Sequence, residues 1–546
     1  MCGIAGILDV HANAPVSEQL DGLLAWLVKR GPDGEGRFVE GHLAMGMRRL
    51  SVIDLEGGWQ PLYAANGQVV AFQNGEIYNY RELRSELERL GFVFRTHSDT
   101  ETLAHGYVAW GIDGLLARVD GMYAMAILDK RSGALHLARD RFGEKPLFYA
   151  SANGRFAWAS NLLAVAAQPW VGTEIDPAAL DDYLATHYTA GPHTFFRGVR
   201  RLLPGHRMVL RVADPQPQVL RYYRPTLDGD SLVGEEELAA ALEASVRSRL
   251  VADVPLGIFL SGGLDSSLIT AIAAKARPGI ETFSMGFDSA AHDEAEHAQR
   301  VAEFCGTRHH RFRFDASSFE TLLPQVAAEL DEPIGDQATL PLYWLCREAR
   351  KHVTVALSGE GADELFGGYG YYRQFLAGAG LVQRWADRLR GRPVAHPAHL
   401  DRFVRNSAAV TPSGFPLLTD ANTRERLTGN SFTTPDRWES DLIAWLDTAN
   451  DTHKRAMSTD LATWLPDNLL VKFDRMAMAN SLEGRAPYLS SRLAEIALRN
   501  CAPFARMNLT DSKLALRRVA RRWLPRDILE RPKQGFVLPM KAWLRG

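Results

Sequence analysis

The chain has 546 residues, of which 46% are hydrophobic and 23% charged, with a formal net charge of -3. This length predicts two or more domains, and the balanced charge argues against the basic surface of a nucleic-acid-binding protein. The four cysteines form no CxxC pair. They favour a reducing, cytoplasmic compartment over a zinc site or a disulfide framework. We also expect no signal peptide and no membrane span, because neither apolar pattern occurs.

Residues 1–211 carry short apolar runs that predict strands, for example 69–72 and 124–128, separated by turn residues. A helix is predicted over 80–90, because Leu83, Leu87 and Leu90 fall on one helical face. The next segment, 212–230, contains Asp-Pro-Gln-Pro and Asp-Gly-Asp. It is the best candidate for a linker, with a hairpin as the alternative.

Cys2, directly after the initiator methionine, is the first candidate catalytic residue. If Met1 is removed, Cys2 carries a free α-amine with a reference pKa of roughly 8. That amine can serve as the general base for the cysteine's own thiol, as in N-terminal nucleophiles. A single cysteine near a terminus is weak evidence, since most such cysteines have no catalytic role.

Polar residues around the predicted strand 69–72 strengthen this hypothesis. The Asn74 amide and the Gly75 backbone N–H could both donate to one oxyanion. Arg49 could bind a carboxylate through two parallel hydrogen bonds, and Glu76 and Asp99 could hold an ammonium group. Taken singly, Asn-Gly is a common turn, and each charged residue is more often part of a solvated surface.

After the linker candidate, the predicted elements follow the order strand, glycine-rich turn and helix. Strands are predicted at 254–260, 281–287 and 353–357, and a helix rich in Ala, Ile and Leu begins at Ser266. Strands that alternate with helices predict a parallel α/β sheet. Ligands of such a sheet bind at the carboxyl ends of its strands.

The turn Ser-Gly-Gly-Leu-Asp-Ser-Ser at 261–267 is the second candidate site. Glycine N–H groups, serine hydroxyls and the following helix N-terminus together favour phosphate binding. The residues concerned are Ser261, Gly262, Gly263, Ser266 and Ser267. Asp265 could hold Mg2+, which prefers oxygen ligands. No GxxxxGK[ST] occurs, which excludes a Walker-type loop. A glycine-rich turn with serine caps is the simpler reading of Ser-Gly-Gly alone.

Six motifs in the first half resemble the class II glutamine amidotransferase domain in order and spacing. They are Cys-Gly-Ile-Ala-Gly at 2–6, Arg-Gly-Pro-Asp at 30–33, Arg-Leu-Ser at 49–51, Asn-Gly-Glu-Ile-Tyr-Asn at 74–79, Ser-Asp-Thr-Glu at 98–101 and Arg-Asp-Arg-Phe-Gly at 139–143. The resemblance implies an Ntn-hydrolase αββα sandwich with Cys2 as nucleophile. It also implies an oxyanion hole from Asn74 and Gly75, which bind glutamine together with Arg49, Glu76 and Asp99.

The 261–267 turn is similar to the PP-loop of ATP pyrophosphatases, which cleave ATP to AMP and pyrophosphate. Together with the glycine-rich segment 358–369 and a basic helix expected at 511–522, it resembles the synthetase domain of glutamine-hydrolysing asparagine synthetases. The resemblance implies nucleotide contacts from Leu260, Met285, Ser358 and Gly359 beside the PP-loop. It also implies that Asp265 and Asp363 bind Mg2+ and pyrophosphate and that Lys513 meets the negative charge that develops at phosphorus. Glu360 would support formation or capture of the acyl-adenylate. Glu360 and Asp363 could instead be simple helix caps.

These resemblances predict a glutaminase domain at 1–211, a linker at 212–230 and an α/β ATP-binding domain at 231–546. The expected reaction is ATP-driven amidation of a carboxylate through an acyl-AMP intermediate, with aspartate to asparagine the favoured case. The expected partners are L-glutamine, ATP with Mg2+ and that small carboxylate, with no nucleic acid or membrane. A homodimer is one possible assembly.

Several positions depart from the family's usual residues. They are Met47, Asn161 to Leu163, Gln337, Ala338, Ala477, Gly484, Ala486 and Ser490. Smaller side chains could reshape the acceptor pocket, so the first alternative is the same chemistry on another small carboxylate in a specialised pathway. A second alternative is a glutaminase or regulatory protein whose synthetase domain is inactive. The intact motifs at 261–267 and 358–368 speak against the second.

Overall fold

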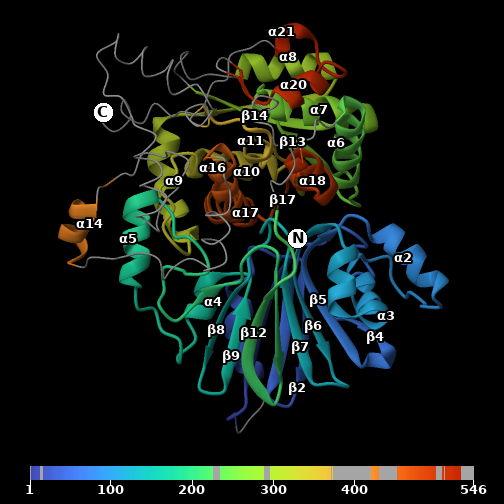
Figure 1. Cartoon of the computed structure of the whole chain (residues 1–546), viewed down its shortest axis with the longest axis vertical. Helices are drawn as coiled ribbons and strands as arrows, with labels where there is room; N and C mark the ends of the chain where they lie inside the picture. The colour runs from blue at the N-terminus through green and yellow to red at the C-terminus, as the bar shows by residue number, and fades with distance from the viewer. Residues whose placement is uncertain are drawn as a thin grey trace.

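The computed structural model describes residues 2–12, 16–225, 234–287, 295–370, 372, 419, 421–429, 452–499, 507–508 and 511–529. Two layered bodies lie one above the other in Figure 1. The lower body contains two antiparallel sheets, and the upper body contains one parallel sheet.

The lower body is a four-layer αββα sandwich. Its first sheet has the order β10 (Arg200–Arg201), β8 (Phe148–Ala152), β9 (Arg155–Ala159), β1 (Cys2–Asp9), β3 (Leu43–Arg49) and β2 (Gly34–Glu40). The second has the order β12 (Asp214–Arg221), β11 (His206–Arg211), β7 (Ala134–Arg139), β6 (Gly121–Asp129), β5 (Val69–Ile77) and β4 (Leu62–Ala64). Helices α1 (Ser17–Ala25) and α4 (Leu162–Ala166) cover the first sheet, and α2 (Tyr80–Arg89) and α3 (Thr100–Arg118) cover the second.

Strand β1 shows why the sandwich forms. Its side chains alternate between faces, as in any strand, but both faces are buried. Ile4 and Leu8 pack between the two sheets, whereas Ala5 and Ile7 pack against the α1 and α4 layer. An apolar run without polar alternation is therefore a strand covered on both sides. The expected Ntn-type αββα architecture is confirmed.

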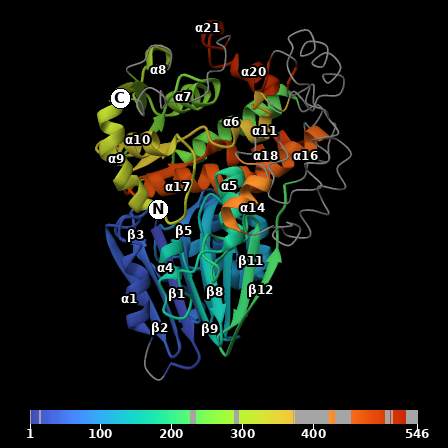
Figure 2. The same ribbon diagram turned by 90° about the vertical axis from the view of Figure 1, so that its left-hand side faces the viewer.

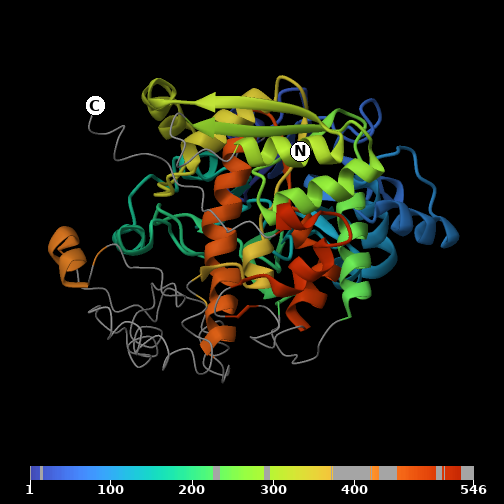
Figure 3. The ribbon, with the colours of Figure 1, turned by 90° about the horizontal axis from the view of Figure 1, so that it is seen from above.

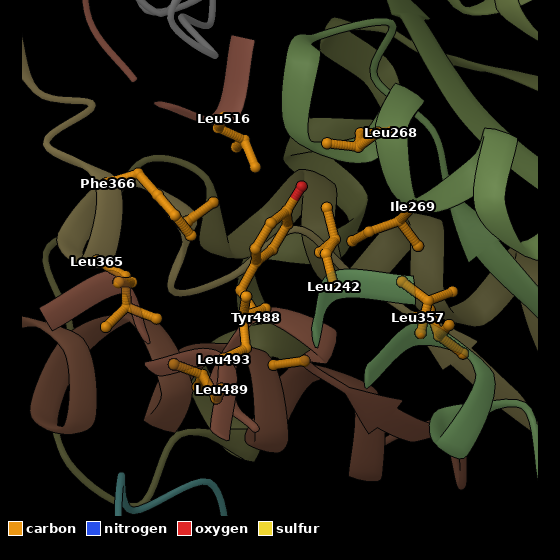
Figure 4. Packing of buried hydrophobic residues seen from close by; sticks show 14 of the residues in the cluster. Leu242, Leu268, Ile269, Leu357, Leu365, Phe366, Tyr488, Leu489, Leu493 and Leu516 are labelled. Atoms are coloured by element: carbon orange, nitrogen blue, oxygen red, sulfur yellow. The ribbon is translucent and has the colours of Figure 1, made fainter. Parts of the chain in front are cut away.

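The upper body is built on a five-stranded parallel sheet. Its order is β15 (Arg308–Phe314), β14 (Glu281–Phe287), β13 (Leu256–Phe259), β16 (Val355–Leu357) and β17 (Glu483–Arg485). One face packs on α6 (Glu235–Arg249), α7 (Leu264–Ala276), α11 (Ala362–Phe366), α18 (Ser491–Arg499) and α20 (Leu514–Ala520). Figure 4 shows this core, with Tyr488 lying among leucines from α6, α7 and α20. The other face packs on α10 (Thr339–Ala349) and α17 (Leu470–Met478).

The remaining elements connect or flank these layers. They are η1 (Ala65–Gly67), α5 (Pro177–Thr186), α8 (Ala295–Cys305), α9 (Ala316–Glu329), α14 (Ala421–Thr428), α16 (Thr452–Thr459), η4 (Asp460–Leu469), η5 (Pro487–Leu489) and α21 (Arg526–Leu529). Helices α16, η4 and α17 run on as one rod, orange to red-orange in Figure 3. Its α17 end lies at the boundary between the two bodies in Figures 1 and 2. No helix in the described ranges is long and apolar enough to cross a membrane.

The structure confirms the predicted helix at 80–90 and the strand at 281–287, and it shortens the strands predicted at 254–260 and 353–357. Part of the expected linker differs. Residues Asp214–Arg221 form β12, the hairpin partner of β11. Pro215 and Pro217 are tolerated because β12 is an edge strand of its sheet. Residues 226–230 of the segment lie outside the described residues, and the exact domain boundaries stay a prediction.

Candidate functional site

Cys2 is the first residue of β1 and lies opposite Arg49 of β3 in the antiparallel ladder. The side chain is buried, with 7% of its surface exposed. Burial raises the pKa of the Cys2 thiol, whereas the Leu50 backbone N–H and the Arg49 guanidinium lower it. Glu76 is also close enough to act on this pKa, in the raising direction. The fold thus gathers three predicted residues, Cys2, Arg49 and Glu76, that are far apart in the sequence.

Asn74 and Gly75 lie in β5, on the sheet that faces β1. Asn74 donates from Nδ2 to Ser160 Oγ at 3.2 Å, and the same hydroxyl accepts the Ile4 N–H at 3.0 Å. Gly75 has φ +147°, and a Cβ there would lie 1.9 Å from the Met122 carbonyl oxygen. Only glycine fits this backbone. The predicted oxyanion donors are therefore held beside the start of β1.

The Arg49 guanidinium is held by the loop that follows it. Its Nη1 donates to the Leu55 carbonyl at 3.0 Å, and its Nη2 donates to the carbonyls of Ile53 at 3.2 Å and Asp54 at 2.6 Å. Its guanidinium carbon also lies 4.8 Å from the centre of the Trp59 ring. These bonds use three of the five N–H donors of the guanidinium. The loop at residues 53–55 therefore sets the direction in which the guanidinium points.

Glu76 and Asp99 form an acidic pair near Cys2. Asp99 accepts the Ile77 N–H at 2.8 Å and Gln73 Nε2 at 3.1 Å, and burial raises its pKa. Burial also raises the pKa of Glu76, followed by repulsion from Glu483 and from Asp99. Glu76 Oε2 is buried without a hydrogen-bond partner in the described part of the chain. A buried, unpaired carboxylate oxygen is costly unless a cation meets it, which suits a ligand ammonium group.

The second centre is a cavity of about 360 Å³ at the carboxyl ends of β13, β14 and β16. Ten predicted residues line it: Leu260, Ser261, Gly263, Asp265, Ser266, Met285, Ser358, Gly359, Glu360 and Asp363. Gly262, Ser267 and Lys513 were predicted here as well but are not among the lining residues. The cavity is also lined by residues that the motifs did not predict for the site, including Phe259, Phe283, Leu342 and Lys472.

The loop between β13 and α7 is shaped by its own hydrogen bonds. Ser266 Oγ accepts the Ser261 N–H at 3.2 Å, and Ser261 Oγ accepts the Gly263 N–H at 3.3 Å. Gly262 has φ +74°, and a Cβ there would lie 2.6 Å from the Ala298 nitrogen of α8. The glycine thus lets α8 approach the loop, and α7 begins directly behind Gly263 with its N-terminus toward the cavity.

Asp265, Asp363 and Lys513 form an ionic triad at this cavity. Lys513 Nζ lies 2.5 Å from Asp265 Oδ2 and 2.8 Å from Asp363 Oδ1. Burial lowers the pKa of Lys513, but the two carboxylates outweigh it and raise the pKa above its ordinary value. Lys513 was expected inside a basic helix; instead it precedes α20 with φ +55°. Gly368 makes room, since a Cβ there would lie 1.7 Å from Asp363 Oδ1.

The donor set of this triad fits Mg2+. Asp265 and Asp363 supply hard carboxylate oxygens, and Asp265 Oδ1 is buried without a hydrogen-bond partner in the described ranges. In those ranges as a whole, this site included, no cluster of three or more His, Cys, Asp or Glu side chains could hold a metal ion. Two carboxylates are the usual protein share when phosphate oxygens provide the other ligands.

Glu360 lies on the same cavity beside an ion pair of a buried lysine and a partly buried aspartate, which the motifs did not predict. Burial raises the pKa of Glu360 to about 7; Lys472 lowers it, and Asp336 and Asp363 raise it further. Lys472 Nζ lies 2.5 Å from Asp336 Oδ2. The sequence signal for this ion pair is the single lysine within the apolar run 469–473, because a charged side chain that is buried must be paired.

Four of the family departures lie away from this cavity. Ala477, Gly484, Ala486 and Ser490 are buried but do not line it. A Cβ on Gly484 would lie 2.6 Å from the Phe473 ring, so the glycine packs against α17. Ala338 is the departure that does line the cavity.

The α17 helix carries residues that face both centres. Lys472 lines the cavity, and Asp474 receives Arg30 Nη1 at 2.6 Å and Lys145 Nζ at 3.4 Å from the other domain. Arg30 Nε in turn donates to the Cys2 carbonyl at 3.4 Å. The two candidate centres are thus connected across the domain boundary by one helix.

Comparison with known proteins agrees with this two-centre arrangement. Residues 1–223 match the model of the glutamine amidotransferase domain, and residues 237–546 match the asparagine synthase model. The chain belongs to the asparagine synthetase family. This amidotransferase is 37% identical to a putative glutamine-hydrolysing asparagine synthetase of Mycobacterium bovis, over 100% of this chain and 88% of the relative. It is 34% identical to glutamine-hydrolysing asparagine synthetase 1 of Bacillus subtilis, with the same coverage.

Among solved structures, the allosteric regulatory enzyme of purine biosynthesis matches with a TM-score of 0.31 and 18% identity. The match covers 57% of this chain and 80% of that one. That likeness is too slight to carry an argument about this member of the asparagine synthetase family.

Proposed function

We propose that the chain hydrolyses L-glutamine at Cys2 and uses the ammonia, with ATP, to amidate a small carboxylate through an acyl-AMP intermediate. The favoured acceptor is aspartate, which becomes asparagine. The observation that carries the proposal is that the predicted residues gather into two clusters in one chain, connected by α17 through Lys472 on one side and Asp474 on the other.

At the first centre, the Cys2 thiolate attacks the side-chain amide of glutamine. Asn74 and Gly75 donate to the oxygen on which negative charge develops. Arg49 binds the α-carboxylate, and Glu76 and Asp99 bind the α-ammonium. The raised pKa of the Cys2 thiol supports a role for a base, and a free α-amine on Cys2 can supply it.

At the second centre, the N–H groups and hydroxyls of the 261–267 loop bind phosphate oxygens, with Leu260, Met285, Ser358 and Gly359 placing the nucleotide. Asp265 and Asp363 would hold Mg2+, which when bound neutralises the phosphate charge. Lys513 adds a fixed positive charge between these carboxylates. The acceptor carboxylate attacks the α-phosphorus, and pyrophosphate leaves.

Glu360 is placed to handle the proton when ammonia attacks the acyl-adenylate. A group whose pKa lies near the working pH is the most effective general acid or base, and the pKa of Glu360 is raised to about 7. Lys472 and Asp336, beside it, offer a cation and an anion that can pair with the α-carboxylate and α-ammonium of an amino-acid acceptor.

Aspartate is favoured over a different carboxylate because four of the family departures do not line the cavity. Ala338 keeps the alternative open, since a small side chain there leaves space for a larger acceptor. A glutaminase with an inactive synthetase domain is the weakest candidate, because the Asp265, Lys513 and Asp363 triad is intact.

The deciding experiment measures products with each substrate left out in turn. With glutamine, ATP, Mg2+ and aspartate, we expect glutamate, AMP, pyrophosphate and asparagine in equal amounts. Cys2→Ala should abolish the use of glutamine but retain amidation with ammonia, and Cys305→Ala serves as the matched thiol control. ADP as the nucleotide product would refute the acyl-AMP intermediate. Adenylation of another carboxylate, with no asparagine formed from aspartate, would refute aspartate as the acceptor.

A further inference from the structure

The loop that fixes Arg49 is held from outside its own domain. The carbonyls of Ile53, Asp54 and Leu55 accept all three hydrogen bonds of the Arg49 guanidinium described above. These residues form no helix or strand, and Asp54 has a left-handed backbone with φ +53°. Because such a loop is not held by a sheet ladder, its position depends on the contacts made around it.

Two carboxylates anchor this loop. Asp54 accepts the N–H groups of Gly57 at 3.0 Å and of His97 at 2.7 Å, both within the glutaminase domain. Asp253 belongs to the other domain. Its Oδ2 accepts the Asp54 N–H at 2.8 Å, and its own N–H donates to the Val52 carbonyl at 2.9 Å. The Ile53–Asp54 peptide is therefore bound on both sides, because its N–H donates to Asp253 and its carbonyl, that of Ile53, accepts from Arg49 Nη2.

Asp253 is itself held in place by the synthetase sheet. Arg485 of β17 donates from Nη1 to the carbonyls of Val251 and Arg249, each at 2.7 Å. The Arg485 carbonyl accepts the N–H of Ser358, which lines the ATP-site cavity, at 2.9 Å. Asp253 thus stands on a rigid part of the second domain, three residues before β13.

We propose that Asp253 is a positioning residue for glutamine binding: it fixes, across the domain boundary, the loop that aims Arg49. The proposal rests on the proposed function, in which Arg49 binds the α-carboxylate of glutamine. Loss of the Asp253 acceptor loosens the Ile53–Asp54 peptide, so Arg49 must be ordered when glutamine binds. That cost falls equally on the bound substrate and the transition state, and it raises KM rather than lowering kcat.

The test uses the full-length enzyme and compares Asp253→Ala with Asp253→Asn. The Asp54 to Asp253 bond is exposed, so the chain can satisfy the freed N–H with water and should fold. We expect Asp253→Ala to raise KM for glutamine about threefold to tenfold, the range of one net hydrogen bond. The kcat for glutamine and the rate with ammonia should stay unchanged. Asn keeps an acceptor oxygen at the same place and should restore KM.

The matched control is Glu329→Ala, which removes another contact across the domain boundary, the ion pair with Lys29, without touching the Arg49 loop. Its KM for glutamine should equal the wild-type value. A second readout uses 4-aminobutanamide, which lacks the α-carboxylate that Arg49 binds. Asp253→Ala should raise KM for glutamine and leave KM for 4-aminobutanamide unchanged.

An equal loss on both substrates, or an unchanged KM for glutamine, would overturn the proposal. The failure of the proposed function looks different. If Arg49→Lys hydrolyses glutamine with the wild-type KM, Arg49 does not bind the carboxylate, and the Asp253 inference falls with that assignment. If Arg49→Lys raises KM and Asp253→Ala does not, only the positioning role is wrong.

Discussion

Asp474→Asn is the substitution that we expect to weaken the domain boundary most selectively. Asp474 is buried in α17 and pairs with Arg30 at 2.6 Å and Lys145 at 3.4 Å, both also buried. Burial alone would raise the pKa of Asp474, but Arg30 and Lys145 outweigh it and lower the pKa. Asn keeps the shape of the side chain and removes its charge, so two buried cations lose their shared anion.

The expected loss in the free energy of unfolding is about 3–5 kcal/mol, the cost of removing one partner from a buried ion pair. The control Glu329→Ala breaks the pair with Lys29, whose side chain is 63% exposed. It should cost about 0–1 kcal/mol, as surface ion pairs do. Because the pKa of Asp474 is lowered in the folded state, its stabilisation is present above the ordinary aspartate pKa. The difference between wild type and Asp474→Asn should therefore shrink in acid.

The assay is urea unfolding of the full chain at neutral pH, followed by tryptophan fluorescence, with the midpoints of the two variants compared with wild type. Asp474→Asn should shift the midpoint strongly and Glu329→Ala hardly at all. Equal midpoints for Asp474→Asn and Glu329→Ala would refute the argument, because burial would then not distinguish the two pairs. Equal rates of ammonia release in both variants would show that the first centre itself is intact.

Three further predictions concern the two centres. Gly75→Ala should abolish glutamine hydrolysis and leave amidation with ammonia, because a Cβ would lie 1.9 Å from the Met122 carbonyl oxygen; a glutaminase rate near wild type would contradict this. Lys513→Met should abolish carboxylate-dependent pyrophosphate release but spare glutamine hydrolysis, since Lys513 balances Asp265 and Asp363; pyrophosphate release at the wild-type rate would refute it. Amidation at a constant concentration of free NH3 should rise with pH through about 7 as Glu360 ionises, and Glu360→Gln should lack this inflection. A wild-type profile that is flat between pH 6 and 8 would rule out Glu360 as the base.

Local chain chemistry accounts for the features that could be predicted from the sequence. The amphipathic spacing of Leu83 and Leu87 fixes α2, and the glycines at 262 and 263 fix the turn between β13 and α7. Such signals need only neighbouring residues, because helical period and backbone freedom act within a few positions. The motifs likewise pointed to Cys2 and to the PP-loop before any fold was known.

Other features were decided by tertiary structure alone. Whether 214–221 forms a linker or a strand depended on β11 being available as its partner. The role of Lys472 required Asp336, 136 positions away in the sequence, and the place of Asp253 required a loop 199 positions earlier. The departures at Ala477 and Gly484 are matters of packing once α17 and β17 lie together. Contacts between distant segments are set by how layers stack, and no short window of sequence contains both partners.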